Sequence, residues 1–426
     1  MTRRRVLRRV AALQMVTIDP IRHALVPVDA DAAQRLCSPN YDEFQNDREI
    51  WDLLQEQPES VLRVTMPHCN ARIPEEMLSD GAPEALTLAT GTMEELRESV
   101  ATRVAEGIIF LYEIVDTARP GVRQIGLGGM VPTDDIRTDA TPDGVIIRNE
   151  GIREEKARGR ANLIEATQAI IGTVNLSVDD ADNHLLGAMQ DYADARPCDF
   201  EASDEVENGH RIWLISAPDE IESFRAVLAV EPHAYVADGN HRSAAAAMRG
   251  TGEFLAVFFP ARTMGLAPYN RLVNAPGTTR AQLEEALAGQ FEIENLEVPE
   301  FQPTEIHEIG IYLEGAWLKL VPRETAFDAD NAAESIDANM VQRHLFAAVL
   351  GIEDPRAKEL TFVGGNRDAA YLKAQVDAGD HDLAVTMAPV TMDQFIEVCR
   401  QNRIMPPKST WFQPKIRSGL VMALLK

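Results

Sequence analysis

One junction constrains the fold of this chain more than any other feature of its sequence. Residues 234–237 (AYVA) form a short apolar strand that runs directly into DGNHR at 238–242, and SAAAAMR follows as one of the strongest helix-forming runs in the chain. Gly239 permits a tight turn, and Gly250 stands where a helix is expected to end. We therefore expect a strand, a turn and a helix, which together form the unit of an α/β fold.

The same junction has the residues of an anion site. The first turn of a helix offers unpaired backbone N–H groups and the positive end of the helix dipole. Gly239 lets a ligand approach closely, Asp238 or Asn240 can cap the helix, and His241 and Arg242 add donors at the same end. Phosphate is the natural ligand. The alternative is a capped helix with Arg242 in a surface ion pair and His241 satisfied in the core.

Apolar spacing predicts alternating helices and strands on both sides of one linker, APGTTR at 275–280. Before it we expect a strand at 59–66, a helix at 92–105, a hairpin of strands at 108–115 and 121–131, a helix at 153–170 and a strand at 254–259. After it we expect a helix at 281–288, strands within 309–321, and helices at 340–350 and 392–402. The chain then divides into a basic tail (1–15), a larger domain (16–274) and a smaller α+β domain (275–426), whose segment 404–421 packs back on the site.

Net charge limits the partners that this chain can have. It has 426 residues, with 41 Lys and Arg against 67 Asp and Glu, which gives a net charge of −26. Such a surface repels phosphate backbones, and only the first ten residues are basic enough to form a patch, so we expect no nucleic-acid partner. No apolar run reaches the length of a membrane span, so we expect no membrane partner. The sequence leaves the oligomeric state open.

The cysteines and histidines indicate neither disulfide bonds nor a metal site. The four cysteines lie far apart, and no two form a C-x-x-C pair: Cys37, Cys69, Cys198 and Cys399. A reducing, cytoplasmic location fits this use of cysteine best. Several histidines lack metal-ligand spacing and are expected to be structural, among them His23, His68, His184 and His344.

Three acids in predicted loops are candidates for catalysis: Asp42, Glu150 and Asp238. Their plainer interpretations are a turn or cap for Asp42, a solvated acid for Glu150 and a helix cap for Asp238.

A cationic, hydroxyl-bearing strip near the end of the chain consists of Lys408, Ser409, Thr410, Lys415 and Arg417. Positive charge within an otherwise acidic chain indicates a bound anion. The alternative is that prolines fix an extended segment there, packed by Trp411 and Phe412.

Five short motifs, in order, resemble those of a large bacterial and archaeal family long called domain of unknown function 1015. YVADGNHRSAAA resembles the family signature, and SPNYDEF near the start is similar to its PPYDV segment. RNE at 148–150 falls where the family usually has HExT, and APYNRLV at 267–273 resembles its PTHRLV. MPPKSTWFQPKIRSGL at 405–420 is similar to its C-terminal signature.

The resemblance implies a fold: an α/β, ParB/sulfiredoxin-like mixed domain with a second, smaller α+β domain. The shared feature of that superfamily is a G-x-H-R or G-x-R-R loop that holds nucleotide phosphates at a helix N-terminus. Its members include kinases that phosphorylate free L-serine with ATP or ADP. By resemblance, this chain is similar to a small-molecule kinase that uses ATP or ADP and Mg²⁺, with a nucleotide and a small hydroxyl compound as its partners.

The resemblance also assigns expected roles to residues. The residues expected to bind the nucleotide phosphates are Gly239, Asn240, His241, Arg242 and Arg271, together with Lys408, Ser409, Thr410 and Lys415 of the strip. A kinase also needs a carboxylate to orient or deprotonate the acceptor hydroxyl. We choose Glu150 as that base, Asp42 as its partner on the substrate or magnesium ion, and Asp238 as a further catalytic acid; no specific metal ligand is assigned.

Three departures from the family pattern leave the acceptor open: Asn149 and Asn270 replace histidines, and Ile152 replaces a threonine. A nucleotide-binding sensor without transfer activity therefore stays as the alternative function. Sulfiredoxin chemistry is disfavoured because it needs a cysteine within the loop, where this chain has Asn240. The net charge disfavours the DNA binding of ParB proteins.

Overall fold

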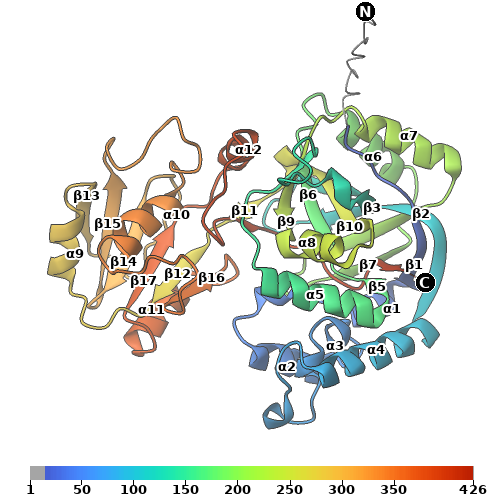
Figure 1. Ribbon diagram of the computed structural model, residues 1–426, viewed down its shortest axis with the longest axis horizontal. Helices are drawn as coiled ribbons and strands as arrows, with labels where there is room; N and C mark the ends of the chain where they lie inside the picture. The colour runs from blue at the N-terminus through green and yellow to red at the C-terminus, as the bar shows by residue number, and fades with distance from the viewer. Residues whose placement is uncertain (1–14, 426) are drawn as a thin grey trace, which may run out of the picture.

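The computed structural model describes residues 15–425 as two lobes, each built on its own β-sheet (Figure 1). The chain is mixed α/β, as the sequence predicts. The ParB/sulfiredoxin-like class and the exact domain bounds stay predictions. Of the predicted basic tail, residues 1–14 lie outside the described residues.

The first lobe is organised around an 11-stranded mixed sheet. Its main path runs in the order β4 (Ile146–Ile147), β9 (Ala234–Asp238), β6 (Val174–Val178), β10 (Glu253–Pro260), β3 (Arg123–Pro132), β2 (Thr102–Val115), β1 (Ile21–Pro27), β19 (Met422–Leu424) and β5 (Ala169–Ile170). Beside β2 lie β8 (Gly209–Ile215) and then β7 (Phe200–Ser203). The pairs β10–β6 and β4–β9 are parallel, and the others are antiparallel.

Helices cover both faces of this sheet. They are α1 (Ala30–Leu36), α2 (Asp47–Glu56), α3 (Leu62–Thr65), α4 (Pro83–Glu98), α5 (Glu154–Thr167), α6 (His184–Asp194), α7 (Pro218–Leu228) and α8 (Asn240–Arg249). On one side α8, α5 and α4 lie one against the next (Figure 1), whereas α6 and α7 pack on a separate core cluster. Alternate residues of β10 enter the two clusters, Val257 one and Phe258 the other, so this strand is buried on both faces.

The hairpin predicted at 108–115 and 121–131 is confirmed as β2 and β3, but one neighbouring prediction is wrong and another is right only in part. The strand expected at 59–66 is the short helix α3, where the apolar residues Val61, Leu62 and Val64 are buried in two different clusters. Packing on both sides outweighs the local alternation that indicates a strand. The helix expected at 92–105 is α4, which starts earlier and ends at Glu98, and β2 begins at Thr102.

The second lobe contains a six-stranded antiparallel sheet. Its order is β13 (Phe291–Leu296), β15 (Ala316–Pro322), β14 (Ile309–Leu313), β17 (Leu383–Met387), β12 (Asn270–Val273) and β16 (Leu360–Val363). Its helices are α9 (Arg280–Leu287), α10 (Asp337–Met340), α11 (Ala369–Asp377) and α12 (Met392–Arg400). The single helix expected at 340–350 is instead the end of α10 followed by a π-helical turn, Val341–Ala347.

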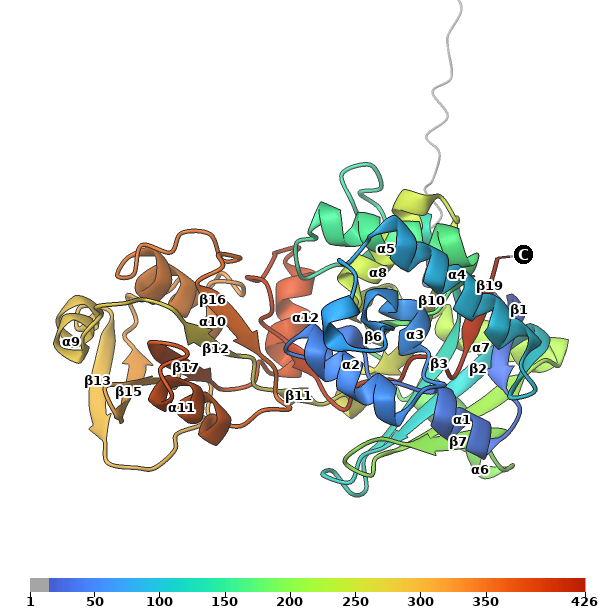
Figure 2. The ribbon, with the colours of Figure 1, turned by 90° about the horizontal axis from the view of Figure 1, so that it is seen from below.

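The end of the chain connects the two lobes. Strand β18 (Trp411–Phe412) pairs with β11 (Leu266–Ala267), and both residues of β18 are buried. Helix α12 lies between the lobes (Figure 2), where Phe395 contacts the rings of Tyr235 in β9 and of Phe412. Beyond β18 the chain enters the first lobe, and β19 pairs with β1 on one side and β5 on the other.

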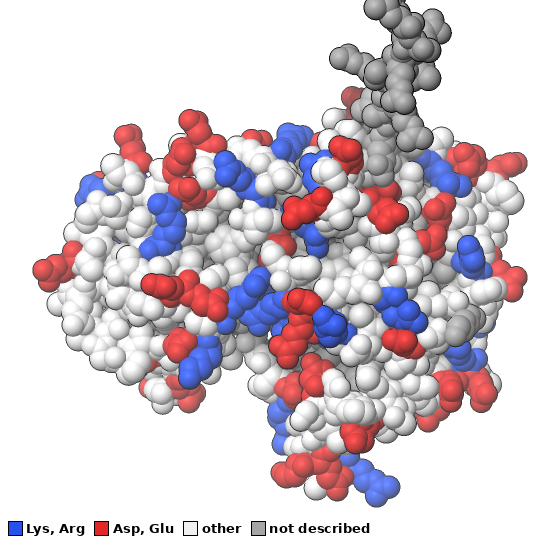
Figure 3. All heavy atoms as spheres, in the orientation of Figure 1, with Lys and Arg blue, Asp and Glu red and all other residues white. Residues whose placement is uncertain are grey.

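Charged side chains of both signs lie on the surface of the described residues (Figure 3). Acidic and basic side chains are interspersed over the face drawn in Figure 3, without an extended basic patch on that face. None of the helices within residues 15–425 is long and apolar enough to cross a membrane.

Candidate functional site

The junction between β9 and α8 has the geometry that its sequence predicts. Strand β9 ends at Asp238, helix α8 begins at Asn240, and Gly239 between them has a φ of 105°. A Cβ atom at Gly239 would lie 3.2 Å from the Cα of Val174, so a larger residue would be both strained and crowded. The expectation that Asp238 or Asn240 caps the helix is wrong, because Gly239 is the N-cap residue and no side chain caps it. The N–H groups of the first turn therefore lack a capping acceptor.

A cavity of about 50 Å³ lies at this helix end. It brings together every predicted site residue except Arg271 and Ser409. Its lining consists of Tyr41, Asp42, Glu150, Ala237, Asp238, Gly239, Asn240, His241, Arg242, Tyr269, Lys408, Thr410, Phe412 and Lys415. We call it the junction cavity. Its residues come from five separate parts of the sequence, and a cavity of this size holds a few water molecules or a group of similar size.

Lys415 joins two of the predicted acids. Its Nζ lies 3.0 Å from Asp238 Oδ2 and 3.3 Å from Asp42 Oδ2, and all three side chains are largely buried. Burial opposes ionisation of Asp238, but Lys415 and Arg242 outweigh it and hold the pKa of this carboxyl well below its ordinary value. Burial likewise opposes ionisation of Asp42, and Lys415 and Lys408 outweigh it, so its pKa is also lowered. Both acids are therefore anionic at neutral pH.

Arg242 is already engaged within the protein. Its Nη2 lies 2.9 Å from Asp238 Oδ1, and Nη1 donates to the carbonyl oxygen of Thr173 and to Asn40 Oδ1. The alternative interpretation, in which Arg242 forms a surface ion pair, is therefore right in part. Arg242 does pair with an acid, but the pair is buried. The guanidinium holds Asp238 in place, and Arg242 is one of the residues that line the cavity described above.

Two oxygen atoms in the cavity lining lack a hydrogen-bond donor. Asp42 Oδ1 and Asn240 Oδ1 are buried and have no partner among the described residues. The other end of the Asn240 amide is fixed, since its Nδ2 donates to Asn149 Oδ1 at 3.2 Å. Carboxylate and amide oxygens are the ligand types that Mg²⁺ takes, so these two residues fit a magnesium ion.

His241 is a neutral donor. Its Nε2 accepts a hydrogen bond from the backbone N–H of Arg153 at 2.9 Å, which places the ring proton on Nδ1. Burial and the nearby Lys408 lower the pKa of His241 to about 4, so the ring stays neutral at pH 7. His241 can therefore donate one hydrogen bond to a ligand but cannot contribute a positive charge.

Glu150 and Lys408 complete the polar lining. Burial raises the pKa of Glu150 above that of an ordinary glutamate, although the positive charge of Lys408 opposes the shift. The Lys408 side chain is 33% exposed, its Nζ lies 3.7 Å from Asp42 Oδ2, and it sits 5.5 Å from the centre of the Tyr269 ring. Lys408 is thus more open to a ligand than Lys415, which is enclosed between the two aspartates.

The two remaining predicted residues contact backbone rather than the cavity. The Arg271 guanidinium donates to the carbonyl oxygens of residues 269, 270, 407 and 408, and it is buried. Ser409 Oγ donates to the carbonyl oxygen of Pro406 at 2.7 Å. Both therefore shape the loop that carries Lys408, and their assignment as phosphate ligands stays a prediction.

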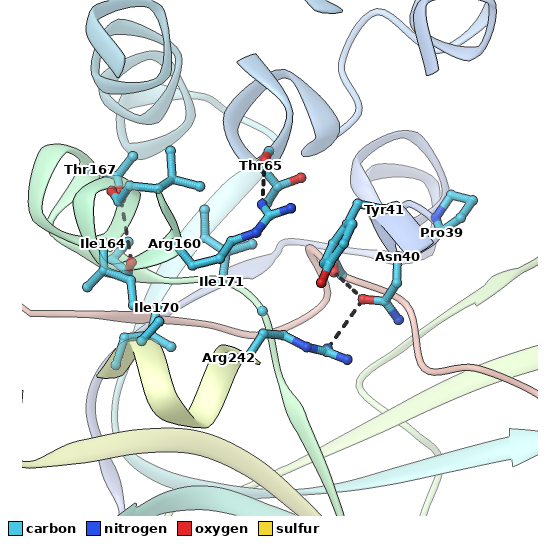
Figure 4. Close-up of a pocket in the computed structure, with 15 residues that line it drawn as sticks. Pro39, Asn40, Tyr41, Thr65, Arg160, Ile164, Thr167, Ile170, Ile171 and Arg242 are labelled. Atoms are coloured by element: carbon cyan, nitrogen blue, oxygen red, sulfur yellow. Dashed lines mark hydrogen bonds between the residues drawn. The ribbon is translucent and has the colours of Figure 1, made fainter. Parts of the chain in front are cut away.

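A second, mostly apolar cavity adjoins the first through Tyr41 and Arg242 (Figure 4). Ile164, Ile170 and Ile171 line one part of it, and the Arg160 guanidinium stacks on the Tyr41 ring at 4.1 Å. We call it the isoleucine cavity. Tyr41 could have been found in the sequence, because it precedes Asp42 in the SPNYDEF motif. Arg160 could not have been predicted from the sequence, because it is one of several charged residues on a helix and nothing distinguishes it from the others.

Comparison with known proteins identifies the family. The family described as "Protein of unknown function (DUF1015)" matches residues 18–345. The chain belongs to the DUF1015 family. The match contains the junction motif and ends before the segment that carries Lys408 and Lys415. Among curated proteins, none matches the sequence.

Solved structures show only a distant likeness to this DUF1015 protein. A conserved hypothetical protein from Pyrococcus furiosus has 12% sequence identity and a TM-score of 0.38, covering 70% of this chain and 95% of its own. A free serine kinase in complex with AMP has 11% identity and a TM-score of 0.38, covering 67% and 86%. SbnI with C-terminal truncation from Staphylococcus aureus has 10% identity and a TM-score of 0.37, covering 70% and 87%. These scores are too low to carry an argument about this chain.

Proposed function

We propose that this protein is a small-molecule kinase that transfers a phosphoryl group from ATP or ADP to the hydroxyl group of free L-serine or a similar compound. The observation that supports it most is the junction cavity itself. An uncapped helix end, two lysines, two anionic aspartates and a glutamate with a raised pKa surround one small space. Phosphoryl transfer needs this combination, because it depends on positioning and on neutralising charge.

The donor phosphates would bind at the start of α8. The free N–H groups of the first turn, Lys408 and the Nδ1–H of His241 are the donors available there. The nucleoside part would extend into the isoleucine cavity, which shares Tyr41 and Arg242 with the junction cavity. Asp42 and Asn240 would hold Mg²⁺, which neutralises phosphate charge when bound.

Glu150 is the proposed base. The acceptor oxygen would form a bond to the terminal phosphorus, the bond from phosphorus to the leaving nucleotide oxygen would break, and the hydroxyl proton would pass to the Glu150 carboxylate. Only ionised Glu150 can accept that proton. Because its pKa is raised, turnover should increase with pH through a range above the ordinary glutamate pKa of about 4.3.

The test is incubation of the purified protein with L-serine, Mg²⁺ and either ATP or ADP, with phosphoserine detected by mass. Glu150→Gln should lower turnover by roughly two to four orders of magnitude and leave nucleotide affinity nearly unchanged. Glu155→Gln is the matched control, because Glu155 is an exposed acid at the start of α5 and should show no effect.

The outcomes separate the proposal from its alternative. Full turnover in Glu150→Gln with loss in Asp42→Asn or Asp238→Asn would identify a different base. Full turnover in all three variants would refute the mechanism. Tight nucleotide binding without product for any small hydroxyl acceptor would instead support the nucleotide-binding sensor.

A further inference from the structure

A cluster of metal-ligand side chains lies in the first lobe, outside both cavities. Asp47 is the first residue of α2, and His68 and Cys69 lie in the short 3₁₀ helix Pro67–Cys69. One ligand atom from each of the three residues lies within 4.8 Å of the other two. None of the three lines the junction cavity or the isoleucine cavity.

His68 is the unusual member of this cluster. Its side chain is only 1% exposed, yet neither ring nitrogen makes a hydrogen bond to the described residues. Nε2 lies 3.4 Å from Asp47 Oδ1, and Nδ1 lies 3.8 Å from Asp80 Oδ1. A buried imidazole without a hydrogen bond is costly, because it loses its contacts with water and gains none in return. A ligand bound to Nε2 would remove that cost.

The donor set selects the kind of ligand. A thiolate, an imidazole and a carboxylate together suit Zn²⁺, which binds such groups at about 2.0–2.3 Å in a tetrahedron. Ligand atoms on one tetrahedral ion are then roughly 3.3–3.8 Å apart, so the observed separations require only small movements. Magnesium and calcium prefer oxygen ligands and do not fit.

We propose that Asp47, His68 Nε2 and Cys69 bind one Zn²⁺ ion, with a water molecule as the fourth ligand. Asp80 would orient the ring by accepting a hydrogen bond from Nδ1–H, the usual arrangement for histidines that bind zinc. Asp47 is about half exposed, which gives the ion a path from solvent. The site would fasten the start of α2 to the buried segment that carries His68.

Zinc binding must release a proton. Zinc binds a cysteine as the thiolate, whereas a free cysteine is mainly a thiol at neutral pH. The zinc–sulfur bond forms as the S–H proton leaves for the buffer. Zinc affinity should therefore rise with pH, and calorimetry in buffers of different ionisation enthalpy should report about one proton released.

The experiment uses untagged full-length protein freed of metal by a chelator and then titrated with Zn²⁺ against a chromophoric chelator. We expect one ion per chain and a rise in Tm on binding, because the ligand binds only the folded form. Co²⁺ serves as a spectroscopic probe, since it gives intense visible bands in a tetrahedral site and a near-ultraviolet band when bound by a thiolate.

Substitutions decide whether this cluster is the site. Asp47→Asn removes a ligand at an exposed position and should weaken Zn²⁺ binding by about 100-fold or more, whereas Asp80→Asn should weaken it by about 10–100-fold. Asp52→Asn is the matched control on the same helix and should change nothing. Cys69→Ser should remove the Co²⁺–thiolate band, with the buried Cys399→Ser as its control.

Two results would overturn the proposal: wild-type protein that binds no Zn²⁺, or zinc affinity that is equal in wild type and Asp47→Asn. The comparison of zinc affinity between wild type and Asp47→Asn stays decisive even if Cys69→Ser fails to fold. Asp47 is exposed, and asparagine keeps the shape of its side chain. Neither result bears on phosphoryl transfer, which concerns other residues.

Discussion

Replacing Lys415 by methionine should destabilise the protein strongly, because it leaves two buried carboxylates without their shared cation. Lys415 Nζ lies 3.0 Å from Asp238 and 3.3 Å from Asp42, and its side chain is only 6% exposed. Removal of one partner of a buried ion pair costs about 3–5 kcal/mol. Asp238 keeps Arg242 at 2.9 Å and Asp42 keeps Lys408 at 3.7 Å. We therefore expect a loss near the lower end, about 3 kcal/mol at pH 7.

The loss should depend on pH in a definite direction. The pKa values of Asp42 and Asp238 are lowered on folding, so these acids contribute stability above their unfolded pKa of about 4, and that contribution is lost as the pH falls toward the folded values. Without Lys415 the folded pKa values rise. The difference in the free energy of unfolding between wild type and Lys415→Met should therefore be fully present at pH 7 and shrink as the pH falls below about 4.

The assay is denaturant unfolding followed by tryptophan fluorescence at several pH values, with equal m-values checked for the two proteins. Lys408→Met is the control, because the Lys408 side chain is 33% exposed and lies 3.7 Å from Asp42. This substitution should lower the free energy of unfolding by only about 0–1 kcal/mol. The reasoning is refuted if Lys415→Met costs no more than Lys408→Met at pH 7, or if its cost does not fall between pH 4 and the lowest pH at which wild type stays folded.

Three further predictions test other parts of the structure by the same unfolding measurements. Gly239→Ala should cost about 1–3 kcal/mol and weaken ADP binding, since it forces a side chain into a positive φ against Val174; Gly250→Ala, with a φ of 72° and open space, should cost only about 1 kcal/mol and leave ADP binding intact. Arg271→Lys should lower stability by about 1–3 kcal/mol, because an ammonium cannot reach four carbonyl oxygens at once; an unchanged Cm would contradict this. Burial raises the pKa of Asp337 to about 7, so wild-type stability should fall as the pH rises from about 4 to 7, and Asp337→Asn should flatten this slope; an unaltered slope would exclude Asp337 as its source.

The sequence was most informative where structure is determined locally. Gly239 and Gly250 predicted both ends of α8, because each adopts a positive φ that other residues avoid. The hairpin of β2 and β3 followed from its β-branched and aromatic residues. The segment 59–66 could not be predicted in the same way, because Val61 and Leu62 are buried in different clusters and only the folded lobe decides which backbone buries both.

The residues of the candidate site could be predicted from the sequence, but their contacts could not. The family motifs indicated which residues to consider, and the structure brings Asp42, Glu150, Asp238 and Lys415 to one cavity. Their partners could not be predicted, because Lys415 is placed between Asp42 and Asp238 by the return of the chain from the second lobe. Arg271 shows the same limit: its motif indicated the residue, but its contacts with carbonyl oxygens depend on a loop formed by residues near 407.

The position of β19 determines the order in which this chain can fold. Ala423 pairs with Ala24 of β1 on one side and with Ile170 of β5 on the other, so β1 keeps an open edge and β5 has no partner strand until residues 422–424 have been made. Open strand edges attract other strands, which makes a partly synthesised chain vulnerable to aggregation. Lys415 belongs to the same late segment. A nascent chain therefore gains the cation between Asp42 and Asp238 only when its last segment joins the first sheet. A chain that lacks this segment also lacks Lys408 and Lys415, and so cannot form the junction cavity.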